Sequence, residues 1–185
     1  IYDQLLIWYY IKIGNLSRAF LLAKALDKRL NQKGLELLEL DNLANQQEKE
    51  IEALSIFEYI AHQYPGSNAG IQAQVAAFFI EQQLLEKTNS VDPKKINELI
   101  KKYKDLLNTI SSNQLLQLSI VKNIAYLQAY YLQQYTVAIE QINQGLKFSQ
   151  ITSSSKNELK ILLGDIYLLK GETGEAALLY AQVEK

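Results

Sequence analysis

Apolar residues along this chain recur every three to four positions, which is the spacing of one helix face, and no long stretch alternates as a strand would. Residues 157–185 hold two such stripes, separated by Gly171. The first comprises Leu162, Leu163, Ile166 and Leu169, and the second comprises Ala176, Ala177, Tyr180 and Val183. Gly171 predicts the end of the first helix, and Thr173 is placed to cap the second. The stretch therefore predicts a hairpin of two antiparallel helices.

Two small residues lie where these helices are expected to cross. Gly164 is on the first helix and Ala176 is on the second. A small side chain at a crossing lets two helix backbones approach closely. A single hairpin cannot bury both of its faces, so the pattern predicts neighbouring hairpins.

Four earlier stretches repeat this arrangement: residues 2–30, 34–65, 67–110 and 114–146. Gly14 takes the place of Gly171 in the first stretch, and Ser17 is expected to cap the helix that follows it. The third stretch departs from the pattern because its loop at 87–91 is long, although Asp92-Pro93 predicts a clear helix start. We therefore expect an all-α fold of about five hairpins, the third divergent.

The spacing of small and aromatic residues resembles that of the tetratricopeptide repeat (TPR), a 34-residue helical hairpin. The last hairpin carries the pattern at Leu163, Gly164, Tyr167, Gly171, Ala176, Tyr180 and Val183, and the second hairpin carries it at Ala53, Phe57, Ile60 and Pro65. Ala53 follows Ala19 by 34 residues (53 − 19). The resemblance implies an α-α superhelix over residues 1–185, a single TPR-like domain that we expect to be a fragment of a longer array.

Longer stretches are similar to large bacterial TPR proteins of the Bacteroidetes type. They are AFLLAKALDKRLN, IFEYIAHQYPGS and LLGDIYLLKGETGEAALLYAQVEK. Members of that group are often exported and have no assigned catalysis. The resemblance therefore favours an extracytoplasmic, periplasmic location over a cytoplasmic one.

Composition excludes several kinds of site. The 185 residues are 48% hydrophobic, which suffices for a core, and their net charge of -1 gives no basis for binding nucleic acid. No apolar run reaches the length of a membrane span, so membrane insertion is not expected. The chain has no cysteine, and His62 is its one histidine. We therefore expect no metal site, no cofactor and no catalysis.

Aromatic and amide side chains supply the candidate binding residues. In a TPR array the first helix of each hairpin lines a concave groove, and the resemblance assigns groove positions residue by residue. They are Trp8, Lys12, Asn42, Asn45, Gln46, Leu127, Tyr130, Tyr131 and Asp165. Aromatics bury a large area at low entropic cost, and amides hydrogen-bond a peptide backbone, so this set suits an extended peptide. A second interpretation stays open, in which the aromatics are buried by neighbouring repeats.

The resemblance and these residues favour a protein-interaction scaffold that holds a peptide or partner protein in its groove. One alternative is a structural segment of a larger envelope-associated protein that self-associates through its exposed ends. Another is the non-catalytic part of an enzyme whose active domain lies outside this stretch.

Overall fold

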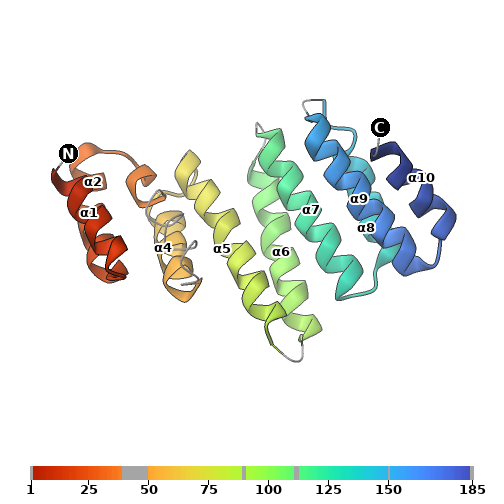
Figure 1. Cartoon of the computed structure of the whole chain (residues 1–185), viewed down its shortest axis with the longest axis horizontal. Helices are drawn as coiled ribbons and strands as arrows, with labels where there is room; N and C mark the ends of the chain where they lie inside the picture. Colours follow the sequence, from red (N-terminus) through yellow and green to blue (C-terminus); the bar gives the residue numbers. More distant parts are fainter. Residues whose placement is uncertain (1, 39–49, 89–90, 111–112, 150, 184–185) are drawn as a thin grey trace. The chain divides into compact units, whose positions relative to one another are not determined.

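The computed structural model describes residues 2–38, 50–88, 91–110, 113–149 and 151–183 (Figure 1). These residues form helices and connecting turns, and no strand occurs among them. Two compact units divide the chain, Ile1–Lys87 and Thr88–Lys185. The all-α prediction is confirmed. A single domain over residues 1–185 stays a prediction.

The first unit contains four described helices: α1 (Tyr2–Lys12), α2 (Leu16–Leu30), α4 (Glu50–Gln63) and α5 (Asn68–Glu86). The second unit contains α6 (Pro93–Thr109), α7 (Gln114–Tyr130), α8 (Tyr135–Gly145), α9 (Ser153–Lys170) and α10 (Thr173–Val183). Predicted hairpin partners pack together as α1 with α2, α7 with α8, and α9 with α10. The two helices of the divergent third hairpin, α5 and α6, fall in different units.

Helix ends follow the local chemistry of their flanking residues. Gly171 has φ +90° and closes α9, as predicted, by donating its N–H to carbonyls of the last turn. The Asp92 side chain accepts from the Lys94 N–H at 2.9 Å, which confirms the start of α6. Two cap predictions are wrong. Asn15 caps α2 in place of Ser17, and Thr173 is already the first residue of α10 because the turn after Gly171 is short.

Small residues line the core of the first unit, where α2 and α4 present alanine to their neighbours. Ala19, Ala23 and Ala53 are fully buried, and Phe57 and Ile60 fill the space beside them. The core of the second unit joins α7, α8 and α9 through Leu118, Ala125, Ala129, Ala138, Ile142, Leu159, Leu162, Leu163 and Ile166. This core holds α7 and α9, the first helices of two successive hairpins, against α8.

A buried carboxylate ties together three parts of the first unit. Asp27, near the end of α2, is 1% exposed. Its Oδ1 accepts from the Gly34 N–H at 2.8 Å, and its Oδ2 accepts from the Tyr64 hydroxyl at 2.8 Å. Gly34 has φ +98°, which favours glycine, and a side chain there would meet Ile60 and Tyr64 at 3.0 Å. Asp27 therefore fixes the loop after α2 against the end of α4.

Replacing Asp27 with alanine should lower the free energy of unfolding by on the order of 3 kcal/mol. Two hydrogen bonds to a charged group are lost, and the buried Gly34 N–H is left without an acceptor. Chemical denaturation measures the change, and Glu58→Ala on the exposed side of α4 is the matched control. An Asp27→Ala variant as stable as this control would contradict the role assigned to Asp27.

The same network predicts a loss of stability in alkali. Burial and the Asp27 carboxylate raise the pKa of Tyr64 from 10.0 to about 12. The raised pKa gives a contribution that is complete below pH 10 and is lost as the pH rises toward 12. Between pH 9 and pH 12, the free energy of unfolding should therefore fall less steeply with rising pH for Tyr64→Phe than for the wild type. Tyr2→Phe, at an exposed position, should follow the wild-type slope.

Candidate functional site

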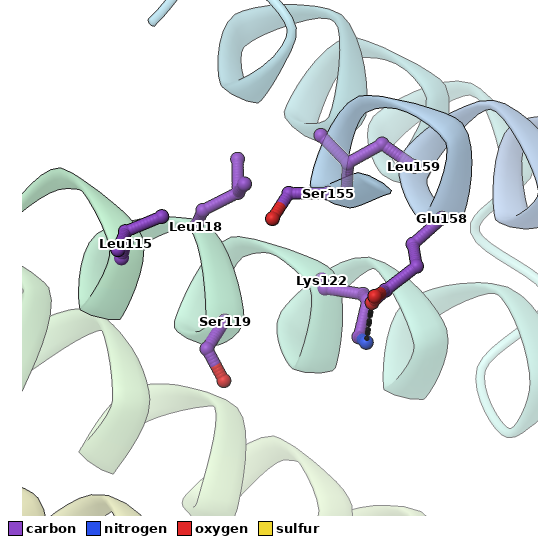
Figure 2. Close-up of a pocket in the computed structure, with 7 residues that line it drawn as sticks. All are labelled: Leu115, Leu118, Ser119, Lys122, Ser155, Glu158 and Leu159. Carbon is purple, nitrogen blue, oxygen red and sulfur yellow. Dashed lines mark hydrogen bonds and ion pairs between the residues drawn. The ribbon is translucent and has the colours of Figure 1, made fainter. Parts of the chain in front are cut away.

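A pocket of about 160 Å³ opens between α7 and α9 (Figure 2). We call it the leucine pocket, and its lining residues are Leu115, Leu118, Ser119, Lys122, Ser155, Glu158 and Leu159. The α7 residues at 115, 118, 119 and 122, and the α9 residues at 155, 158 and 159, follow the i, i+3, i+4 spacing of one helix face, so each helix contributes one face. Because α7 and α9 are both first helices, the pocket lies on the side of the second unit where the sequence places a groove.

The lining of the leucine pocket is apolar at its base and neutral in charge. Leu118 and Leu159 are 5% and 1% exposed, whereas Leu115 is 55% exposed. The Lys122 ammonium pairs with the Glu158 carboxylate at 2.8 Å, so the two charges offset each other (dashed line in Figure 2). A cavity of roughly 150 Å³ can admit a group the size of benzene. The leucine pocket therefore suits one aliphatic side chain.

An aromatic and acidic group of side chains continues the same face of the second unit. We call it the tyrosine cluster, and it comprises Tyr126, Tyr130, Tyr131, Asp165 and Tyr180. The rings of Tyr126 and Tyr130 stack with centroids 4.5 Å apart, and Tyr131 meets Tyr126 edge-on at 6.0 Å. The Tyr180 hydroxyl donates to Asp165 Oδ1 at 2.6 Å. Residues 115, 119, 122, 126 and 130 follow one side of α7, so pocket and cluster are continuous along this helix.

Gly164 makes room for the tyrosine cluster. A Cβ atom at this position would lie 2.7 Å from Cε1 and 2.9 Å from Cζ of Tyr180. Ala176, one turn before Tyr180 on α10, is fully buried. The structure thus places both small residues at the contact between α9 and α10, where the sequence put them. The closeness of this contact lets Tyr180 reach Asp165.

The Asp165 carboxylate dominates the electrostatics of the cluster. Its hydrogen bond, together with burial and its negative charge, raises the pKa of Tyr180 from 10.0 to about 12. Burial raises the pKa of Tyr130 as well, and the charge of Asp165 adds to the effect. Both phenols therefore stay protonated at neutral pH beside a negative carboxylate.

The first unit places two predicted groove residues together on α1. The Lys12 ammonium lies 5.7 Å from the centroid of the Trp8 ring, and Trp8 is 55% exposed. This separation is within the range of a cation–π interaction. Tyr2, Leu5 and Tyr9 are exposed on the same helix, which is apolar around most of its circumference.

The other predicted groove residues have three outcomes. Tyr130, Tyr131 and Asp165 come together in the tyrosine cluster. Asn42, Asn45 and Gln46 lie outside the described residues. Leu127 is fully buried, so it offers nothing to a partner, and its assignment to the groove is corrected. Ile166 on α9 is fully buried in the same way.

The error at Leu127 has a physical cause in the turn between α7 and α8. Four residues separate these helices, whereas two separate α9 from α10. Because the turn before α8 is longer, counting back from Ala138 at the spacing of the last hairpin does not keep the register on α7, and the burial pattern of residues 124–127 matches that of residues 163–166. When Ala125 is aligned with Gly164 instead, Tyr126 takes the groove position of Asp165. In the sequence, Tyr126 precedes Tyr130 by one helical turn within a tyrosine-rich stretch, whereas the leucine pocket has no sequence signal of its own.

Other kinds of site find no support in the described part of the chain. His62 is an exposed residue in the last turn of α4. No group of three or more His, Asp or Glu side chains that could hold a metal ion occurs among the described residues. None of the helices in those ranges is long and apolar enough to cross a lipid bilayer.

Comparison with known proteins rests on solved structures. No protein-family model matches the sequence, and no curated protein matches it. BtubC (BKLC) from P. vanneervenii superposes with a TM-score of 0.70 at 16% identity, over 98% of this chain and 77% of that chain. TTC0263, a thermophilic TPR protein of Thermus thermophilus, superposes with a TM-score of 0.62 at 17% identity, over 98% of this chain and 88% of that chain.

A third structure shares the repeat itself. It contains the TPR-like repeats of a putative kinesin light chain from Podospora anserina, and it superposes with a TM-score of 0.64 at 16% identity, over 98% of this chain and 91% of that chain. This chain has the TPR-like helical repeat fold. At such identities the likeness concerns the fold alone. The similarity to Bacteroidetes proteins stays a prediction.

Introducing a methyl group at Gly164 should lower the free energy of unfolding by about 1–3 kcal/mol, because the new Cβ overlaps the Tyr180 ring. In a Tyr180→Ala background, Gly164→Ala should instead raise the free energy of unfolding, because the overlap is gone and alanine favours helix over glycine by about 1 kcal/mol. Chemical denaturation of the four proteins measures both effects. Gly174→Ala, where no atom lies within 4 Å of the new Cβ, is the control. A stabilising Gly164→Ala in the wild-type background would contradict this packing.

Proposed function

We propose that this chain is a protein-interaction scaffold whose first-helix face on α7 and α9 binds an extended segment of a partner protein. The observation that carries the proposal is the continuity of the leucine pocket and the tyrosine cluster along these two helices. A pocket with an apolar base beside partly exposed aromatic rings is a common composition of an interaction hot spot. The TPR-like fold supports the proposal, because solenoids of helical repeats present extended binding surfaces.

The side chains on this face have different tasks in the proposed complex. The leucine pocket takes an apolar side chain, while Tyr126 and Tyr130 offer flat surfaces that lose little entropy on binding. The hydroxyls of Ser119 and Ser155 offer hydrogen bonds to a peptide backbone. On the first unit, Trp8 with Lys12 offers a further contact of the same kind.

A second function is favoured by one observation on α1. Its exposed apolar residues, Tyr2, Leu5, Trp8 and Tyr9, are between 51% and 77% exposed. Clustered apolar surface of this kind marks an association site. A structural segment that self-associates through α1 would use it.

Selection of peptides from a random displayed library on the immobilised chain tests the scaffold function. Peptides should be enriched, and Tyr130→Ala should weaken the binding of a selected peptide by about tenfold or more, with an unchanged melting temperature. Leu178→Ala on α10, at a residue that is 62% exposed, is the matched control and should leave binding unchanged.

Other outcomes of this experiment assign the aromatics differently. A large fall in melting temperature for Tyr130→Ala would make Tyr130 a packing residue. Selection that enriches no peptide would contradict the scaffold function. If the molecular mass of the chain in sedimentation then rises with concentration, self-association through α1 is the better account.

A further inference from the structure

We infer that the tyrosine cluster receives a lysine or arginine side chain of the partner segment, and that the leucine pocket receives an aliphatic side chain about four residues away in the same segment. This inference rests on the proposed function and specifies the chemistry of the partner. It follows from the charges, the ring faces and the distances on α7, α9 and α10.

The charge on this face is negative where the rings gather. Lys122, the single charged residue of α7, is paired with Glu158, and Lys170 at the end of α9 is paired with Glu172 at 2.7 Å. Asp165 has the Tyr180 hydroxyl as its partner and no basic side chain among the described residues. Its charge is therefore left for an incoming cation to balance.

The carboxylate of Asp165 also retains capacity for hydrogen bonds. An ionised carboxylate can accept about four hydrogen bonds, and Tyr180 donates one, to Oδ1. Asp165 is partly exposed, so a donor can reach it from solvent. Arginine and lysine are the side chains that donate to carboxylates with a matching charge. The geometry thus favours a guanidinium or ammonium group over a neutral donor.

The tyrosine rings offer a second attraction for the same cation. Tyr130 is 40% exposed and stacks on Tyr126, so part of this pair of rings is open to solvent. A cation over a tyrosine face within about 6 Å is attracted by the ring. The first unit supplies such cations from its own chain: Lys24 lies 4.0 Å from the Tyr59 ring centroid, and Arg18 lies 5.6 Å from that of Tyr10. In the described part of the second unit, no basic side chain covers Tyr126 or Tyr130, which leaves this position to a partner.

The spacing of the two subsites sets the spacing in the ligand. The middle of the leucine pocket on α7 is near residue 118, and the tyrosine cluster is centred near residue 128. Ten helical residues rise about 15 Å. An extended peptide advances about 3.3 Å per residue, so this length corresponds to four or five residues. A basic residue and an aliphatic residue about four positions apart therefore fit both subsites together.

An acidic segment fits this face poorly. It would bring a second negative charge to Asp165, and like charges at an interface are unfavourable. The Lys122 ammonium does not compensate, because Glu158 already neutralises it. We therefore assign the site to a basic partner segment.

The peptides selected on the immobilised chain provide the probe. They should be enriched in lysine or arginine about four positions from a leucine, isoleucine or valine. For one selected peptide, replacing its arginine with the neutral isostere citrulline should weaken binding about tenfold at low salt. Affinity for the arginine peptide should fall as salt is raised, because the contact is electrostatic.

A double-mutant cycle places that contact on Asp165. Asp165→Asn keeps an acceptor for Tyr180, so the fold is retained while the charge is removed. This variant should bind the arginine peptide about tenfold more weakly than the wild type does. Its affinity for the citrulline peptide should be within about twofold of the wild-type affinity for that peptide. Glu175→Gln, which removes an equal charge from an exposed position on α10, should leave both affinities unchanged.

The outcomes separate this inference from the proposed function. If selected peptides bind through Tyr130 but lack basic residues, or if Asp165→Asn leaves the arginine peptide unaffected, the basic partner is wrong and the scaffold stands. If peptides rich in Asp or Glu are selected, the sign of the charge argument is overturned. If no peptide is enriched, both proposals fail.

Discussion

The contact between Gly164 on α9 and the ring of Tyr180 on α10 is the constraint on which the last hairpin and the tyrosine cluster depend. Without a Cβ at residue 164, the two helices of the last hairpin approach closely enough for the ring to lie on the α9 backbone. The hydroxyl of the same ring then reaches Asp165, one residue further along α9. A packing contact required by the helical hairpin therefore also fixes the position of the Asp165 carboxylate beside the rings of the tyrosine cluster.

Asp27 and Asp165 each accept a tyrosine hydroxyl from another part of their own unit, and their surroundings give them different roles. Asp27 is 1% exposed and also accepts from the Gly34 N–H, so its bonding is satisfied within the fold. Asp165 is partly exposed and has one donor, so it has both access and remaining capacity. The first is a structural tie between helix ends, and the second is suited to recognition. Burial and the number of donors separate these roles, because the chemistry of the two pairs is the same.

The fold was predictable from sequence because periodicity and small residues carry it directly. Gly171 ends α9 with φ +90°, Asp92 caps α6, and the alanines at 19 and 53 are fully buried where two helices meet. The site was predictable in part. Tyr130, Tyr131 and Asp165 followed from counting along a repeat, whereas Leu127 was misplaced because the turn before α8 is longer than the turn before α10. The leucine pocket forms between α7 and α9, whose lining residues Leu115 and Ser155 are 40 positions apart in sequence (155 − 115). No local sequence pattern encodes how closely these two helices pack.

The central claim is that the α7 and α9 face of the second unit is the binding surface of this TPR-like chain. Backbone chemical shifts of the isotopically labelled chain, recorded while a selected peptide is added, test it most directly. The account predicts that the amides that shift most cluster around Leu115, Lys122, Tyr126, Tyr130 and Asp165, with those of α6 little changed. Shifts concentrated on α1, or spread evenly over both units, would contradict it.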